Sequence, residues 1–282
     1  MENNTVINIQ QCFPKAVSIK NGKEAIVDDI LACATEEGRV EYAGFTKQDT
    51  LRNAVSGWIQ ESEVHSHQEV TPHEKKHIED TITAGLHESL QFLDLASVDV
   101  FVFPRMHQYG QAAKIMGYVT GYTPRVGVIH VYLATEHFSI TSLKSTVVHE
   151  FNHAVFFNNH SNKAQTILDA LVMEGLAENF EEVVMGYRPP VSEGLTETYA
   201  TQSLKHMMPA VDTAVSWDVD SLYRDVFLGG NNYKRWTGYS IGYYVVKSFQ
   251  GVNPGLSWEE IMSIDTEEIF HNSPFVNQIK RS

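Results

Sequence analysis

Cysteine is scarce in this chain, and its scarcity argues against two kinds of structure. Only Cys12 and Cys33 occur among the 282 residues, and no C-x-x-C pair is present. The sequence therefore predicts neither a disulfide framework nor a cysteine zinc site. Two isolated cysteines are also typical of proteins from a reducing compartment.

Long apolar runs are lacking as well. No stretch approaches the roughly 20 residues that a membrane-spanning helix needs. The chain begins Met-Glu-Asn-Asn-Thr-Val, without the basic region and apolar core of a secretory signal. These absences predict a cytoplasmic protein with no membrane partner.

Basic residues are outnumbered by acidic ones. The chain has 21 Lys and Arg against 35 Asp and Glu, a formal net charge of −14. Such a charge argues against binding to nucleic acid or to an anionic membrane surface. With 43% hydrophobic and 20% charged residues, the composition is that of an ordinary globular protein. A chain of 282 residues can form one large domain or two modest ones.

One helical stretch carries a metal-binding pattern. It reads H-E-x-x-H over His149, Glu150 and His153, inside an apolar run from Thr146 to Phe157. Positions four apart lie on one helix face, so the two imidazoles can aim ring nitrogens at one ion. Glu150 can hold a water on the same ion as a general base. We expect Zn2+ here, and two histidines provide only half of its tetrahedral site.

The third ligand must come from another part of the chain. A metzincin would have Gly at position 156 and His at 159, but the chain has Phe156 and Asn159. The stretch E-G-L-A-E from Glu174 to Glu178 follows instead, twenty residues after His153. That gap allows one helix to end and a second to return beside it, so Glu174 can complete a His2Glu site. Glu178 can accept the other ring N–H of a ligand histidine.

The pattern resembles the gluzincin metallopeptidases, in which the third ligand is a Glu on the helix after H-E-x-x-H. The E-G-L-A-E stretch is similar to the E-G-F-A-E type segment of the M1 aminopeptidases. A nearer resemblance is to the predicted zinc-dependent proteases grouped as DUF2268, the YjaZ-like family of Gram-positive bacteria. It rests on three stretches and covers roughly residues 95–250: Ile115–Pro124, His149–Glu178 and Trp236–Tyr243. The resemblance implies a zinc peptidase.

A second H-E-x-x-H copy occurs over His73 to His77, in a different context. Thr71 and Pro72 before it are typical of an N-cap and a first helical residue. Two lysines lie between the histidines, and their charge would oppose a divalent cation. We therefore predict that this copy is an exposed helix start and that zinc binds only at His149 and His153.

The patterning predicts an α+β fold in two parts. Residues 1–95 are expected to form a mainly helical subdomain, with a short strand at Val6–Ile9 and a long helix from Pro72 to about Leu95. Residues 96–282 are expected to form a zincin-like metallopeptidase domain. This domain would contain a small, partly antiparallel sheet, a helical lobe and the metal between them.

Within the second part, alternating β-formers predict strands at residues 98–103 and 126–133. Glycine-rich turns are expected from Gly110 to Gly121. The strand before the metal helix edges the sheet in gluzincins, so the resemblance implies that residues 126–133 pair with an extended substrate.

Helices are expected at residues 141–158 and 163–183 and from Trp236 onwards. Gly238 and Gly242, four apart on the last helix, predict close approach to another backbone.

The expected activity is peptide hydrolysis. Zinc lowers the pKa of its bound water towards ~7 and polarises a carbonyl, and Glu150 would carry the proton to the leaving amine. In related gluzincins a downstream Tyr or His binds the oxyanion. Tyr239 is our candidate, followed by Tyr243 and His206.

Three other functions would use the same residues. A structural zinc clip would normally have a fourth protein ligand and would leave Glu150 without a role. A pseudo-peptidase acting as a scaffold and a hydrolase of a non-peptide amide stay open. The aminopeptidase motif for an N-terminal amine is absent, which favours an endopeptidase or oligopeptidase acting on a peptide or protein. Cleavage preference and oligomeric state are not indicated.

Overall fold

The computed structural model describes residues 5–35, 48–59, 64, 69–105, 110–160, 165–216, 218 and 221–281. The chain divides into two compact units, residues 1–154 and 155–282. This boundary does not coincide with the expected division after residue 95. Strand β1 (Val6–Gln11) pairs with β2 (Ser97–Pro104), so residues on both sides of position 95 share one sheet.

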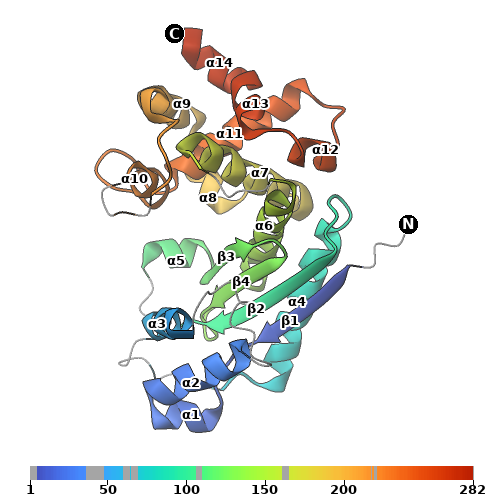
Figure 1. The fold of residues 1–282 in the computed structure, drawn as a ribbon, viewed down its shortest axis with the longest axis vertical. Helices are drawn as coiled ribbons and strands as arrows, with labels where there is room; N and C mark the ends of the chain where they lie inside the picture. The colour runs from blue at the N-terminus through green and yellow to red at the C-terminus, as the bar shows by residue number, and fades with distance from the viewer. Residues whose placement is uncertain are drawn as a thin grey trace. The chain divides into compact units, whose positions relative to one another are not determined.

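The first unit is built on a four-stranded sheet in the order β1-β2-β4-β3 (Figure 1). Strands β1, β2 and β4 (Val128–Leu133) are parallel, and β3 (Val119–Arg125) is antiparallel to β4. The prediction of an α+β fold with a small, partly antiparallel sheet is confirmed. Strand β3 was not predicted, because Gly121 within it reads as part of a turn.

Strand β4 does not edge the sheet. It pairs with β2 on one side and with β3 on the other. Its backbone groups are therefore used on both sides, and the expectation that residues 126–133 pair with a substrate is wrong. The outer strand next to it is β3, which joins β4 through a short turn containing Gly127, whose φ of +69° suits glycine.

Helices cover both faces of this sheet. Aromatic side chains of β2, Phe101 and Phe103, pack into a core with α1 (Ala16–Asn21), α2 (Lys23–Ala34) and α3 (Gln48–Trp58). The alternate residues of the same strand, Val100 and Val102, are also fully buried, on the opposite face. Both faces of the central strands are therefore apolar, as in sheets covered by helices on two sides.

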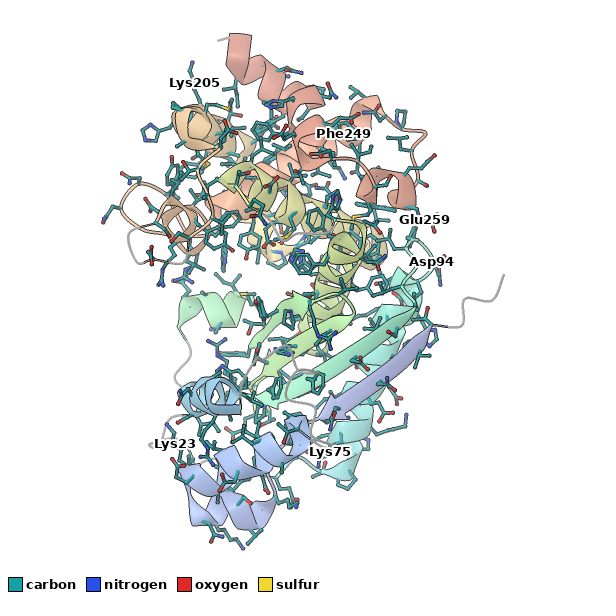
Figure 2. The ribbon with its side chains drawn as sticks, in the orientation of Figure 1. Lys23, Lys75, Asp94, Lys205, Phe249 and Glu259 are labelled. Atoms are coloured by element: carbon teal, nitrogen blue, oxygen red, sulfur yellow. A yellow bond between two sulfur atoms is a disulfide. The ribbon has the colours of Figure 1, made fainter. Side chains whose placement is uncertain are left out.

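The second helical layer contains α4 (Pro72–Ser89) and α6 (Ile140–Asn159). The two helices pack closely, since a Cβ at Gly85 of α4 would lie 3.3 Å from the Lys144 side chain of α6. The two layers can be found in Figure 2 by two labelled lysines. Lys75 lies in the first turn of α4, and Lys23 is the first residue of α2 in the other layer. The short helix α5 (Gln111–Ile115) precedes β3.

Cys12 and Cys33 form a disulfide. Cys12 directly follows β1 and Cys33 lies near the end of α2, and their Cα atoms are 5.3 Å apart. The prediction that the cysteines form no disulfide is therefore wrong. It failed because α2 returns to the end of β1, which the spacing of the two cysteines does not reveal. With this bond present, the two cysteines do not indicate a reducing compartment.

The second unit is helical and is organised around α11 (Thr237–Val252). Among the described residues of this unit, most helices pack against it. They are α7 (Ile167–Met185), α8 (Pro190–Glu193), α9 (Glu197–Met207), α10 (Leu222–Leu228), α13 (Thr266–Asn272) and α14 (Pro274–Arg281). Phe249 of α11 is buried in this unit (Figure 2). The unit also contains a 3-10 turn at Met208–Ala210 and α12 (Trp258–Met262).

Glycines allow α7 and α11 to approach closely. A Cβ at Gly242 would lie 2.1 Å from the carbonyl oxygen of Leu171, and one at Gly175 would lie 2.2 Å from the carbonyl oxygen of Gly242. The prediction of a close backbone approach is confirmed for Gly242. At Gly238 the space is filled by the Phe227 ring instead of a backbone.

In the described part of the chain, no helix has both the length and the apolar composition to cross a bilayer.

Candidate active site

Helix α6 carries the H-E-x-x-H pattern and has the expected position, Ile140–Asn159 against 141–158. It starts next to Ser139, whose carbonyl oxygen accepts the Leu143 N–H and whose hydroxyl accepts the Ser142 N–H. Apolar residues such as Val147 and Phe151 are fully buried and anchor the helix. Because the boundary between the units falls within α6, the two histidines and Glu150 belong to the first unit.

Three side chains on α6 converge. His149, Glu150 and His153 each offer one ligand atom, and these atoms all lie within 4.8 Å of one another. The rings of His149 and His153 have centroids 4.8 Å apart and are nearly perpendicular. Two imidazole nitrogens are donors that zinc accepts, and a carboxylate beside them can hold a water on the ion. The chemistry of this donor set fits a zinc ion.

Glu150 is held by strand β3. Its side chain is buried, with 6% exposed, and one carboxylate oxygen, Oε2, accepts a hydrogen bond of 2.7 Å from the Thr123 hydroxyl. A buried carboxylate requires such donors, because burial without them is costly. Gly121 lies beside it, where a Cβ would come within 2.3 Å of Glu150 Cγ. Neither Thr123 nor Gly121 was predicted as a site residue, although both lie in the Ile115–Pro124 stretch.

Glu174 lies on α7, in the second unit. The helix starts at a capping box in which Thr166 and Asp169 exchange backbone and side-chain hydrogen bonds. Glu174 is buried, as are Glu178 and Glu181. Positions 174, 178 and 181 follow the i, i+4, i+7 spacing of one helix face. Buried carboxylates are uncommon, which agrees with a special role for this face. The assignment of Glu174 as third ligand stays a prediction.

The three candidates for the oxyanion donor have different surroundings, all within the second unit. Tyr239 is half-buried and packs edge-on against Phe227, with ring centroids 5.4 Å apart. Tyr243 is buried and donates its hydroxyl to Glu182 Oε2 at 2.8 Å. Burial, together with the hydrogen bond to Glu182, raises the pKa of Tyr243. The oxyanion role of Tyr239 stays a prediction. His206 is exposed.

The second H-E-x-x-H copy is a helix start, as predicted. Thr71 caps α4 in a capping box with Glu74, and Pro72 is the first helical residue. Glu74 accepts hydrogen bonds from the Thr71 backbone and hydroxyl, which lower its pKa. Both His73 and His77 are exposed. Within the described residues, these side chains form no group that could hold a metal.

Comparison with known proteins agrees with these features. The chain is 26% identical over 133 residues to the "Uncharacterized protein YjfC" of Bacillus subtilis (strain 168), and the aligned part covers 44% of each protein. The chain thus matches less than half the length of this relative. No solved structure matches the chain significantly. The family model DUF2268, described as "Predicted Zn-dependent protease", matches residues 78–271, a span that contains the whole resemblance expected from the motifs. The chain therefore belongs to the DUF2268 family of predicted Zn-dependent proteases.

Proposed function

We propose that this protein is a zinc metallopeptidase that hydrolyses peptide bonds in peptides or proteins. The observation that carries the proposal is the convergence of His149, Glu150 and His153 on one helix, α6. Family membership supports the reaction class, since the family is described as a predicted Zn-dependent protease. We assign a zincin-like arrangement to the chain on the same grounds.

In this proposal His149, His153 and Glu174 hold the metal. Bound zinc would supply a Lewis acid and a water of lowered pKa. Glu150 takes a proton from the attacking water and delivers it to the leaving amine. Tyr239 donates a hydrogen bond to the oxyanion, a role that removes about 3 kcal/mol from the barrier in other hydrolases.

Strand β3 supports a peptide as the substrate. It is the outer strand of the sheet next to β4, and it carries Gly121 and Thr123, which lie against Glu150. The carbonyl oxygen of Tyr118 accepts the N–H of Ala134, and Tyr122 is opposite His130. By the alternation of an antiparallel pair, Gly121 turns its backbone groups to the outer edge, and the register becomes irregular only after Tyr122. An extended peptide main chain can pair with such an edge, whereas a small non-peptide amide has no strand to add.

The first test is the zinc content of the purified protein, measured by elemental analysis. We expect one zinc per chain in wild type, strong depletion in His149→Ala and Glu174→Ala, and full content in His73→Ala as the matched control. Zinc that persists without His149 would overturn the metal site. If zinc is lost in His149→Ala but retained in Glu174→Ala, the metal site stands and Glu174 is rejected as its third ligand.

The second test is proteolysis of fluorescein-labelled casein and of a quenched fluorescent peptide mixture. Wild type is expected to cleave and Glu150→Gln to retain zinc without cleaving. A zinc-loaded wild type that cleaves neither substrate would favour the pseudo-peptidase or the non-peptide amide hydrolase.

A further inference from the structure

We propose that Thr123 is a positioning residue for Glu150 and that Gly121 provides the space in which the Glu150 side chain lies. The inference deepens the proposed function and rests on it, because Glu150 is the general base of that proposal. It assigns a role to the Ile115–Pro124 stretch, which the zinc ligands leave unexplained.

Thr123 is well suited to hold a carboxylate. Its hydroxyl lies 2.7 Å from Glu150 Oε2 and 3.0 Å from the Glu150 carbonyl oxygen. A hydroxyl has one hydrogen to donate, and the shorter distance favours the carboxylate. Thr123 is buried, with 3% exposed, so solvent does not compete strongly for this bond. Its β-branched side chain has few rotamers, and the following Pro124 restricts its backbone to extended conformations.

Gly121 acts through its missing side chain. Residues two apart on a strand share a face, so Gly121 and Thr123 both face Glu150. A Cβ at position 121 would lie 2.3 Å from Glu150 Cγ and 2.6 Å from Oε1. The Glu150 side chain therefore crosses the strand where only glycine leaves room for it. The atoms in the way belong to the Glu150 side chain and not to a backbone, so an alanine would displace the Glu150 carboxylate.

The two contacts together fix the direction of the carboxylate. Thr123 binds Oε2, and Gly121 lets Oε1 lie close to the strand backbone. With one oxygen held, rotation about the last side-chain bond is restricted, and the other oxygen keeps one orientation. A general base requires this, since its oxygen must stay within hydrogen-bond reach of the proton it takes.

The test compares Thr123→Val, which keeps the shape and removes the hydroxyl, with Thr123→Ser, which keeps the hydroxyl. Zinc content is measured by elemental analysis, and kcat and KM with a quenched fluorescent peptide that wild type cleaves. We expect Thr123→Val to keep its zinc and KM and to lose about 10- to 100-fold in kcat, the range seen when a partner of a metal-site residue is removed. Thr123→Ser should recover most of that loss.

Two further variants separate positioning from folding. Gly121→Ala should lower kcat by a similar factor with zinc content intact, because it displaces the same carboxylate. Thr81→Val is the matched control, since Thr81 is also buried and donates its hydroxyl to a carbonyl, that of His77 in α4. Its kcat should equal that of wild type. Equal kcat in wild type, Thr123→Val and Gly121→Ala would overturn the inference while leaving the peptidase in place.

The cobalt-substituted protein provides a readout without substrate. Its visible absorption responds to the geometry around the metal. We expect a changed spectrum in Thr123→Val and Gly121→Ala and an unchanged one in Thr123→Ser and Thr81→Val. If wild type binds metal but cleaves no peptide, the proposed function fails and this spectrum alone decides: identical spectra in all variants would reject the positioning role. A wild type that binds no metal would overturn both proposals.

Discussion

Gly175 of α7 and Gly242 of α11 bring two helix backbones into direct contact. A Cβ at Gly175 would lie 2.2 Å from the carbonyl oxygen of Gly242. Asn179, one turn further along α7, donates from Nδ2 to the carbonyl oxygens of Gly175 and Tyr243 at 2.8 and 3.0 Å. This contact sets the position of α7, the helix that carries Glu174, relative to the centre of the second unit.

Gly242→Ala should destabilise the second unit by about 3 kcal/mol, because the added methyl group meets a backbone that cannot rotate away. Guanidinium unfolding monitored by circular dichroism measures the change. Gly251→Ala is the control in the same helix, since a Cβ there has nothing within 4 Å. We expect that variant to be as stable as wild type or up to ~1 kcal/mol more stable. Equal stability of both variants would contradict the close contact.

Reduction of the Cys12–Cys33 disulfide should lower the stability of the first unit. The bond links residues 21 positions apart, and a loop of this length corresponds to about 3 kcal/mol in the chain-entropy model. Unfolding is measured with and without a reducing agent. The double variant Cys12→Ala, Cys33→Ala should be insensitive to the reducing agent, which separates loss of the bond from other effects. A wild type that responds no more than this variant would show that the bond does not form.

Asp169 predicts a dependence of stability on acid pH. Burial favours a higher pKa for this carboxyl, but hydrogen bonds from Thr266, at 2.5 Å, and from Thr166 and Gln165 outweigh it and hold the pKa below 3.8. Because the unfolded chain binds the proton at a higher pH than the folded chain, the stabilisation is complete above about pH 5. It is lost as the pH falls through 3.8 towards the folded-state pKa.

Thr266→Val removes one of these donors and should cost about 1 kcal/mol at pH 7, since the carboxylate is partly exposed. The variant should also lose less stability than wild type between pH 5 and about pH 3. Thr266→Ser, which keeps a hydroxyl, should follow the wild-type profile. Parallel pH profiles for wild type and Thr266→Val would exclude this hydrogen bond as the cause.

The oxyanion assignment can be tested with two tyrosines of α11. Tyr239→Phe should lower kcat by about 10²-fold with zinc content unchanged. Tyr243→Phe removes the hydrogen bond to Glu182 and should cost about 1 kcal/mol of unfolding free energy. If Tyr243→Phe instead carries the loss in kcat, the role belongs to that hydroxyl.

Local sequence signals were sufficient for the elements that carry the histidines. The apolar spacing around His149 predicted α6 to within one residue at each end, and Thr71 with Pro72 predicted the start of α4. These features depend on residues a few positions apart, so the sequence contains them directly.

Features that depend on tertiary packing were missed. Strand β3 was missed because Gly121 reads as a turn residue. In the structure this glycine lies within a strand, where its missing side chain leaves room for Glu150. The disulfide depends on where α2 returns relative to β1. Because β3 was missed, β4 was predicted to be the edge strand that pairs with substrate. In the structure β3 lies outside β4.

The parallel pairing of β1 with β2 has a consequence for synthesis on the ribosome. Residues Val6–Gln11 pair with Ser97–Val102, so the first strand emerges about 90 residues before its partner. At about 5–20 residues per second it must wait several seconds unpaired. A shortened chain that begins at residue 78, where the family match starts, would lack this strand. It would leave the edge of β2, with its buried valines, open to pairing with another chain.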